Sequence, residues 1–231
     1  MDRYSLLITC EHAGNIIPEG YAYLFAYLFE NQAEVLNSHR GWDPGAWLLA
    51  EFLGEHFGVE PIPFFNTRLL IEPNRSLDHP DLFSEFSNAL DDQEKKKLIA
   101  DFYTPYRELV ETKIKKLAKP VLHISVHTFT PVFNGKERSV DIGLLFYPAR
   151  TGEHSFCKNW YEKLSVVFPN WKTAFNEPYK GIDDGFTTYL RTRFSDDDYL
   201  GIELEWNQKW ATEPDAHKYY DVFAESLSKV V

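Results

Sequence analysis

Short apolar segments alternate along this chain with long amphipathic segments, and this alternation constrains the fold more than any other feature. Four segments have the pattern of strands buried in a sheet: residues 5–10, 121–126, 139–147 and 199–206. Helical spacing or helix start and stop residues mark residues 44–57, 93–118, 153–168 and 214–230. Strands that alternate with such helices predict an α/β fold, with a mostly parallel central sheet covered on both faces.

Other stretches carry less regular signals. Residues 59–65 and 68–71 are strand candidates punctuated by proline and asparagine. Residues 93–118 are expected to form one long helix, or two helices that break near Pro105, where the backbone lacks a hydrogen-bond donor. The apolar positions at helical spacing in that stretch are Leu98, Phe102, Tyr106, Leu109, Ile114 and Leu117.

The composition bounds the class of protein. A chain of 231 residues, 44% of them hydrophobic, can bury one sizeable core, so we expect a single domain over residues 1–231. A formal net charge of -11 disfavours nucleic acid and anionic membranes as partners, and no apolar run approaches the roughly 20 residues that span a bilayer. Residues 1–4 lack a signal-peptide pattern and Cys10 and Cys157 make no disulfide framework, so we expect a cytoplasmic protein, with its oligomeric state open.

Three of the predicted strands end in polar residues that can do chemistry. His12 follows residues 5–10, His127 follows residues 121–126, and Glu205 lies near the end of residues 199–206. For either histidine alone, a structural role is the simpler interpretation. Because ligands of such sheets bind beyond the carboxyl ends of the strands, we expect all three residues to line one cleft.

The available residue types favour a metal ion held by histidine and carboxylate, since the chain has no CxxC pair. A catalytic zinc ion needs three protein ligands and an open position for water. We expect His12, His127 and Asp43, although Asp43 also fits an ordinary N-cap of the following helix. Glu11 is the alternative carboxylate. Consecutive side chains that leave a strand tend to point in opposite directions, which disfavours Glu11 as a ligand beside His12.

Glu205 is the candidate for proton transfer. Glu203 and Glu205 alternate with apolar residues, so on a strand both carboxylates would face one side. One interpretation is an edge strand with a solvent-facing side. The other is a carboxylate that takes a proton from water activated by the metal and passes it to a leaving amine. We expect Glu205 to have that role, and whether Glu203 shares it is open.

Asn74 and Arg75 are the candidate substrate anchor, with Arg68 nearby as an assisting residue. The planar guanidinium of arginine binds a carboxylate through two parallel hydrogen bonds. The alternative is a surface arginine paired with one of the many acidic residues. Because an acidic protein needs local positive charge to hold an anion, we expect a small, carboxylate-bearing substrate.

Five motifs together resemble the N-formylglutamate amidohydrolase family, and their order and spacing match across nearly the whole chain. The motifs are Cys10-Glu11-His12-Ala13-Gly14-Asn15, Trp42-Asp43-Pro44-Gly45-Ala46, Thr67-Arg68-Leu69-Leu70-Ile71-Glu72-Pro73-Asn74-Arg75, Ser125-Val126-His127-Thr128 and Glu205-Trp206-Asn207. The family is similar in fold to the zinc carboxypeptidases. The resemblance therefore implies a three-layer α/β/α domain with a mixed sheet and one zinc ion.

The resemblance also implies roles for single residues. His12 and His127 match the two zinc histidines, and Asp43 falls where the family places its carboxylate ligand. The pair Asn74-Arg75 matches the residues that grip the substrate carboxylate, and Glu205 matches the general base and acid. The implied activity is hydrolysis of the amide of N-formylglutamate or of another N-formyl or N-acyl amino acid.

The chain departs from these patterns at two places. Zinc carboxypeptidases have a glutamate three residues after the first histidine, where this chain has Asn15. Residues 125–128 read Ser-Val-His-Thr, whereas Asp-x-His-Ser is common among the formylglutamate enzymes. A different substrate is therefore open, with Phe129 and Phe133 as candidates to line its pocket. Residues 176–185 resemble a substrate-side loop of a family subgroup.

Three other functions also stay open. A carboxypeptidase-like peptidase or a deacylase would use the same metal centre on another substrate. A carboxylate-binding relative would keep the anchor without turnover. A cysteine hydrolase would use Cys10, which follows a strand rather than a helix N-terminus, so nothing local lowers the pKa of its thiol.

Overall fold

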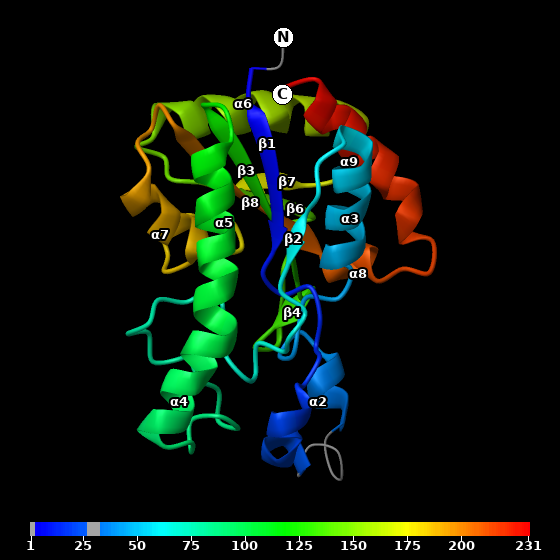
Figure 1. The fold of residues 1–231 in the computed structure, drawn as a ribbon. Helices are drawn as coiled ribbons and strands as arrows, with labels where there is room; N and C mark the ends of the chain where they lie inside the picture. Colours follow the sequence, from blue (N-terminus) through cyan, green and yellow to red (C-terminus); the bar gives the residue numbers. More distant parts are fainter. Residues whose placement is uncertain (1–2, 27–32) are drawn as a thin grey trace.

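The centre of the molecule is a six-stranded sheet (Figure 1). The computed structural model describes residues 3–26 and 33–231. The strands are β1 (Ser5–Cys10), β2 (Ile62–Pro63), β3 (Val121–Phe129), β4 (Val132–Phe133), β5 (Lys136–Glu137), β6 (Ile142–Leu145), β7 (Thr173–Phe175) and β8 (Tyr199–Asn207). The order in the sheet is β2-β1-β3-β8-β6-β7, in which only β6 and β7 run opposite to the other four strands. The predicted α/β fold with a mixed, mostly parallel sheet is confirmed.

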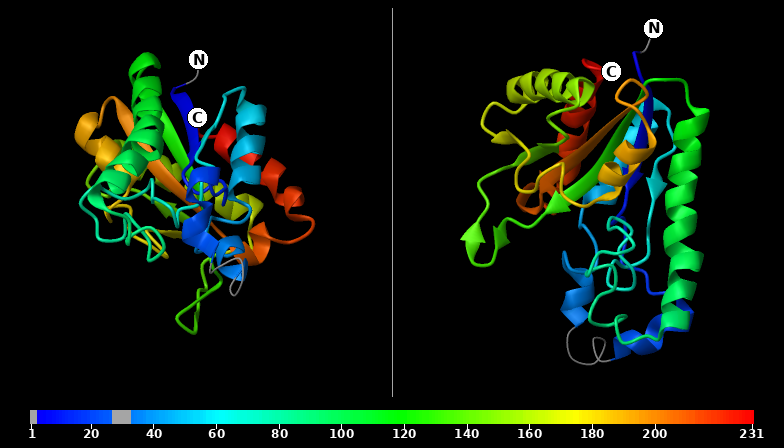
Figure 2. Two further views of the ribbon diagram at one scale, coloured as in Figure 1. Left: turned by 60° about the horizontal axis from the view of Figure 1, so that its bottom comes forward. Right: turned by 90° about the vertical axis from the view of Figure 1, so that its left-hand side faces the viewer.

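Helices cover both faces of the sheet, which gives the molecule three layers (Figure 1 and Figure 2). They are η1 (Glu19–Phe25), α2 (Ala33–Asn37), α3 (Ala46–Phe57), α4 (Asp92–Leu98), η2 (Ile99–Tyr103), α5 (Thr104–Lys116), α6 (Thr151–Val167), α7 (Phe186–Arg193), α8 (Gln208–Ala211), η3 (Ala216–Tyr219) and α9 (Tyr220–Ser228). Helices α3, α6 and α9 pack on one face, and α5 and α7 on the other. In the described part of the chain, no helix has both the length and the apolar character needed to cross a bilayer.

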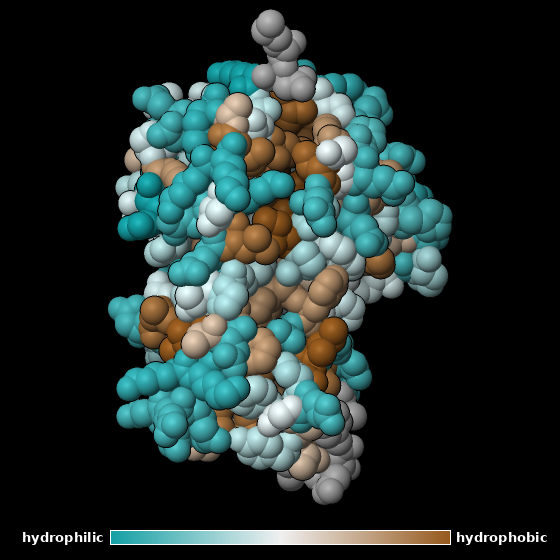
Figure 3. Space-filling model, viewed as in Figure 1, coloured by the Kyte–Doolittle hydropathy of each residue, from teal (hydrophilic) through white to brown (hydrophobic). Residues whose placement is uncertain are grey.

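The two faces of the central strands differ in chemistry. One face packs apolar side chains such as Ile124 and Leu204 against α3, α6 and α9. The face toward α5 and α7 begins with Leu7, Val121 and Tyr199 and becomes polar toward the carboxyl ends of the strands. The polar side chains on this second face are Thr9, Glu11, His123, Ser125, His127, Glu203 and Glu205. Figure 3 shows apolar side chains along the edge of the sheet between α3 and α5.

Two expected strands differ from the structure. Residues 68–70 form a turn, in which the amide of Leu70 donates to the carbonyl of Thr67 at 3.0 Å, and Ile71 belongs to no strand, so the strand prediction for residues 68–71 is wrong. The strand expected over residues 59–65 is limited to β2. Pro61 and Pro63 have no amide hydrogen to pair with a neighbouring strand, which confines this segment to a short edge strand.

A π-helical turn, η2, joins α4 to α5 and shifts the buried face of the helix. The amide of Thr104 donates to the carbonyl of Ile99, five residues earlier, and Pro105 follows at the start of α5. The predicted long helix is therefore continuous but changes register near Pro105. As a consequence Leu109, which the apolar spacing placed with Leu98, is 55% exposed. The buried face of this stretch consists of Tyr103, Tyr106, Arg107, Val110 and Ile114.

The β4–β5 hairpin is an element that the strand pattern missed. Its turn residues Asn134 and Gly135 both have positive φ angles, 50° and 72°. Asn-Gly is the preferred pair of a tight hairpin turn, so this dipeptide was the available signal. The hairpin projects beyond the carboxyl ends of the parallel strands (Figure 2).

The register of α5 predicts unequal effects of two similar truncations. We expect Ile114→Ala to lower the free energy of unfolding by about 2–5 kcal/mol, because it leaves a cavity in a packed core. Leu109→Ala should change it by less than about 0.5 kcal/mol, because Leu109 is exposed. Urea denaturation of both variants measures the difference, and equal losses would contradict the described register.

Candidate active site

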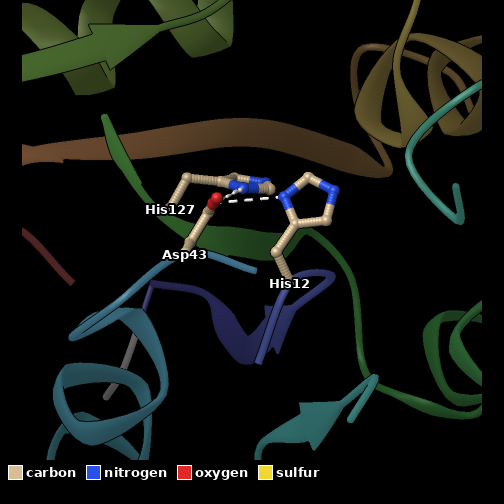
Figure 4. Close-up of side chains that lie close together, drawn as sticks. All are labelled: His12, Asp43 and His127. Carbon is tan, nitrogen blue, oxygen red and sulfur yellow. Dashed lines mark hydrogen bonds and ion pairs between the residues drawn. The ribbon is translucent and has the colours of Figure 1, made fainter. Parts of the chain in front are cut away.

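The carboxyl ends of β1 and β3 bring His12 and His127 together around Asp43 (Figure 4). The Oδ2 atom of Asp43 lies 3.1 Å from Nδ1 of His12 and 2.9 Å from Nδ1 of His127, and all three residues are buried. The N-cap of α3 is Gly45, whose φ of 89° suits glycine, and no side chain caps the helix. The N-cap alternative for Asp43 is therefore wrong. The three predicted metal ligands form one cluster.

Each imidazole is held from behind by a buried carboxylate. Nε2 of His12 lies 2.6 Å from Oε1 of Glu72. Nε2 of His127 lies 2.9 Å from Oγ of Ser125 and 3.2 Å from Oε2 of Glu11. Glu11, the alternative ligand, thus lies behind His127 instead of joining the cluster. Metal-binding histidines usually donate their outer ring N–H to a carboxylate, which fixes the tautomer and leaves the other nitrogen free to bind the metal.

The buried groups of this cluster shift the pKa values of one another. Burial by itself would raise the pKa of Glu11 and Asp43, but the imidazoles outweigh burial and hold each pKa well below its usual range. The pKa of Glu72 is lowered in the same way, by Arg68 and His12. Burial would lower the pKa of His127, but its bonds to Asp43 and Glu11 raise it well above the usual value.

This donor set fits a divalent metal ion. With both imidazoles neutral, Arg68 is the one cation among the described residues that pairs with the carboxylates of Glu11, Asp43 and Glu72, which leaves two negative charges without compensation. One divalent cation would balance them. Two imidazole nitrogens and one carboxylate oxygen within 4.8 Å of one another could hold such an ion, and nitrogen and oxygen ligands of these types bind zinc.

Glu205 lies on β8, opposite His127 in the register of the two strands. Burial raises the pKa of Glu205 to about 8, and this rise persists although His127 acts to lower it. Its Oε2 atom has no hydrogen-bond partner among the residues that the structure describes. Glu203, on the same face, instead accepts a hydrogen bond from Thr187. A carboxyl with a pKa near neutrality can both accept and return a proton, so Glu205 is the better candidate for that role.

The predicted anchor residues differ in how free their side chains are. Arg68 donates from Nε to Glu72 at 2.6 Å, and its Nη1 lies 3.5 Å from Oδ1 of Asp43. Its guanidinium is therefore largely occupied by these two carboxylates. Arg75 donates from Nη1 to the backbone carbonyl of Asp184 and makes no ion pair within the described residues. Its remaining donors are available to a carboxylate. Asn74 uses Oδ1 to accept from the amide that starts α7, which leaves only its Nδ2 donors free.

The cluster, Glu205 and Arg75 line one cavity of about 740 Å³. Residues 80–88 and 179–184 form further walls, and Phe129 and Phe133 also line it, as expected for pocket residues. The carboxylate of Asp184 accepts from the amide of Ser76 at 3.0 Å, which ties the predicted substrate-side loop to the anchor segment. The cavity therefore holds all seven predicted site residues together.

Several residues that support the site were not predicted from the sequence to have a role in it. Ser125 was the easiest to find, because it alternates with His127 on one strand and so faces the same side. Glu72 lies inside a recognised motif, but the histidine that it contacts, His12, is 60 residues away in sequence. Tyr106 on α5 donates to Glu11 at 2.9 Å, and no local signal pointed to this contact.

Cys10 does not suit the role of a nucleophile. Its side chain is fully buried and does not line the cavity. Burial, followed by the charges of Glu11 and Asp43, raises the pKa of its thiol well above the usual value. The thiolate that a cysteine hydrolase needs is therefore strongly disfavoured.

The fold and the site define an α/β protein with a buried His-Asp-His cluster that could hold a metal ion. The family model described as N-formylglutamate amidohydrolase matches residues 4–211, which is most of the chain. The chain therefore belongs to the N-formylglutamate amidohydrolase family, and the resemblance drawn from its motifs is confirmed. Membership of this family supports a hydrolase of the amidohydrolase type.

Solved structures share the fold to different degrees. The crystal structure of the gene product Atu2144 from Agrobacterium tumefaciens matches with a TM-score of 0.78 and 24% sequence identity, over 99% of this chain and 92% of that chain. This likeness concerns the fold alone. None of the curated proteins compared with the chain matches it.

Two amidase structures are more distant. The CwlD amidase from Clostridioides difficile, solved in complex with the GerS lipoprotein, has a TM-score of 0.42 and 14% identity, over 96% of this chain and 93% of that chain. The N-acetylmuramoyl-L-alanine amidase AmiC2 of Nostoc punctiforme has a TM-score of 0.40 and 10% identity, over 97% and 95%.

The carboxylate behind His12 predicts an effect on metal affinity. We expect Glu72→Gln to weaken zinc binding by roughly 10–100-fold, because the imidazole loses the charged partner that fixes its tautomer and orientation. Competition with a chromophoric chelator measures the affinity. Glu85→Gln, at the wall of the cavity and away from the imidazoles, is the matched control, and equal zinc affinities of the two variants would contradict the assignment.

The raised pKa of Glu205 predicts a pH-dependent cost to folding of the metal-free protein. Glutamate in the unfolded chain ionises near pH 4.5, whereas Glu205 in the folded state keeps its proton up to about pH 8. Stability should therefore fall as the pH rises through this window. We expect Glu205→Gln to be close to wild type near pH 4.5 and to be more stable by roughly 4 kcal/mol at pH 8 in urea denaturation. The exposed Glu108→Gln is the control, and a difference independent of pH would contradict the prediction.

Proposed function

We propose that this chain is a zinc-dependent amidohydrolase that cleaves the amide of a small N-formyl or N-acyl amino acid. N-formylglutamate is the first candidate substrate. One zinc ion, held by His12, Asp43 and His127, is the proposed cofactor. The proposed partner is a small anion that bears a carboxylate.

One observation carries the proposal. The His-Asp-His cluster, the carboxyl of Glu205 and the available guanidinium of Arg75 line the same cavity in a member of this family. Amide hydrolysis needs an electrophile for the carbonyl, a group that moves a proton and a way to orient the substrate. The three features meet these three needs.

The proposed proton transfers centre on Glu205. A bound zinc ion would supply Lewis-acid polarisation of the amide carbonyl and would lower the pKa of water. Glu205 accepts the proton of the attacking water and later returns it to the departing nitrogen. Burial raises the pKa of Glu205, and a nearby positive charge lowers it, so this carboxyl can act as base and then as acid near neutral pH.

Arg75 is the proposed receptor of the substrate carboxylate, with the Nδ2 donors of Asn74 beside it. Binding at Arg75 orients the amide relative to the His-Asp-His cluster, which accelerates the reaction by proximity. Arg68 mainly balances the charges of Glu72 and Asp43. Its side chain is 26% exposed and lines the cavity, so it is also a candidate to contact the developing oxyanion.

A larger N-acyl substrate is the second candidate, and the size of the cavity favours it. About 740 Å³ falls within the range of roughly 300–1,000 Å³ that sites for drug-sized ligands occupy, whereas N-formylglutamate is a single small amino-acid derivative. Phe129 and Phe133 would contact the apolar part of such an acyl group.

Turnover assays test the function directly. We expect the zinc-loaded protein to release formate from N-formylglutamate, or acid from another N-acyl amino acid in a panel that includes dipeptides. Removal of zinc should abolish activity, and added zinc should restore it. Stoichiometric zinc without turnover of any compound would instead favour a carboxylate-binding relative, and turnover of dipeptides alone would favour a peptidase.

Two variants separate the proposed roles. Glu205→Gln should lower kcat by roughly 10²–10⁴-fold with zinc content unchanged, since proton transfer contributes about that much. Arg75→Lys should mainly raise KM, because the ammonium cannot form the paired hydrogen bonds of the guanidinium. Arg193→Lys, on the exposed end of α7, is the control. Full turnover by Glu205→Gln would show that the proton-transfer role is wrong.

A further inference from the structure

Helix α5 and the π-helical turn before it contact both ends of the candidate site. Tyr103, Tyr106 and Arg107 lie three and four residues apart, so they share one face of the helix. All three are buried, and none of them lines the cavity. Any effect of these residues on the reaction must therefore pass through the residues that they hold.

Two of these side chains hold the backbone of the anchor. The hydroxyl of Tyr103 donates to the carbonyl of Arg75 at 2.7 Å. Nη1 of Arg107 donates to the same carbonyl at 3.0 Å and to the carbonyl of Pro73 at 3.1 Å. Two donors on one carbonyl oxygen fix the place from which the Arg75 side chain starts.

Arg107 is a buried cation whose hydrogen bonds go to backbone carbonyls. Its guanidinium carbon lies 4.8, 4.5 and 4.4 Å from the ring centres of Tyr103, Phe186 and Tyr189, and it has no carboxylate partner within the described residues. Burial of a cation is costly unless the surroundings compensate for it. Here the three rings and the two carbonyls of the anchor segment provide the compensation.

The third side chain reaches the metal-binding cluster. The hydroxyl of Tyr106 donates to Oε1 of Glu11 at 2.9 Å. The other oxygen of Glu11 accepts from Ser125 and lies 3.2 Å from Nε2 of His127. A chain of contacts thus runs from α5 through Glu11 to a predicted metal ligand.

The π-helical turn η2 changes the register between α4 and this face. Its extra residue places Tyr103, rather than Phe102, on the buried face that begins with Leu98 and continues through Tyr106 and Arg107. π-Helical turns inside helices frequently occur at functional sites. One rigid helix therefore carries the supports of both the anchor and the cluster.

We propose that Tyr103, Tyr106 and Arg107 are positioning residues that set the distance between the metal centre and the carboxylate anchor. They thereby select substrates by the spacing between the amide and the carboxylate. The inference rests on the proposed function for the roles of Arg75 and His127. Tyr103 and Arg107 position Arg75 for binding of the substrate carboxylate, and Tyr106 positions His127 through Glu11.

A series of three N-formyl amino acids tests this selection. N-formylglycine, N-formyl-β-alanine and N-formyl-γ-aminobutyrate place one, two and three carbons between the amide and the carboxylate. We expect wild type to favour one spacing in kcat/KM and Arg107→Lys and Tyr103→Phe to flatten that preference. Both variants should also raise KM for the preferred compound about fivefold with kcat within about twofold, the size of one lost hydrogen bond.

Tyr106→Phe should act at the other end of the site. We expect zinc affinity, measured by chelator competition, to fall by about 3–10-fold, with KM unchanged. Tyr161→Phe on α6, far from the site, is the matched control and should leave all these values as in wild type. An unchanged spacing preference in both Tyr103→Phe and Arg107→Lys, or equal losses across the series, would overturn the proposal and leave α5 a purely structural helix.

Failure of the proposed function gives a different result. If wild type hydrolyses none of the compounds, the proposed function is wrong for these substrates. Measurements of glutarate and zinc binding then test the positioning roles. Calorimetric titration with glutarate should then show weaker binding in Arg107→Lys and Tyr103→Phe, and zinc affinity should fall only in Tyr106→Phe. Binding equal to that of wild type in all three variants would overturn the inference.

Discussion

The balance of buried charge around Asp43 is the constraint on which the rest of the structure depends. A buried carboxylate without a partner costs several kcal/mol, so each of Glu11, Asp43 and Glu72 must be paired. Their partners are two imidazoles, one guanidinium and several hydroxyl and amide donors. These contacts join the ends of β1 and β3 to the segment before α3 and to the turn of residues 67–72, which are far apart in sequence.

The central strands accommodate this charge because one face of the sheet is apolar and the other is polar at its carboxyl end. One face packs apolar side chains against α3, α6 and α9. The other face carries polar side chains at its carboxyl end, where Tyr106 on α5 donates a hydrogen bond to Glu11. A stable sheet and a polar cavity can therefore share the same strands.

Much of this arrangement could be predicted, and the errors have physical causes. The alternation of strands and helices predicted the sheet, and the polar ends of β1, β3 and β8 predicted a shared cleft. No strand forms at residues 68–71. The apolar residues Leu69, Leu70 and Ile71 suggested a strand because they are buried, but burial alone does not require an extended backbone. Leu109 is exposed because the π-helical turn changes the period on which the prediction relied. Glu72 was missed because its partner His12 is 60 residues away.

The sequence by itself determined the type of sheet, the positions of His12, His127 and Glu205 at strand ends, and the presence of an arginine next to Asn74. These properties follow from local periodicity and residue type. Only the tertiary structure decided that Glu72 and Glu11 lie behind the imidazoles, that Arg68 is committed while Arg75 is available, and that burial raises the pKa of Glu205. Those properties depend on distances and burial between segments distant along the chain, which no local pattern specifies.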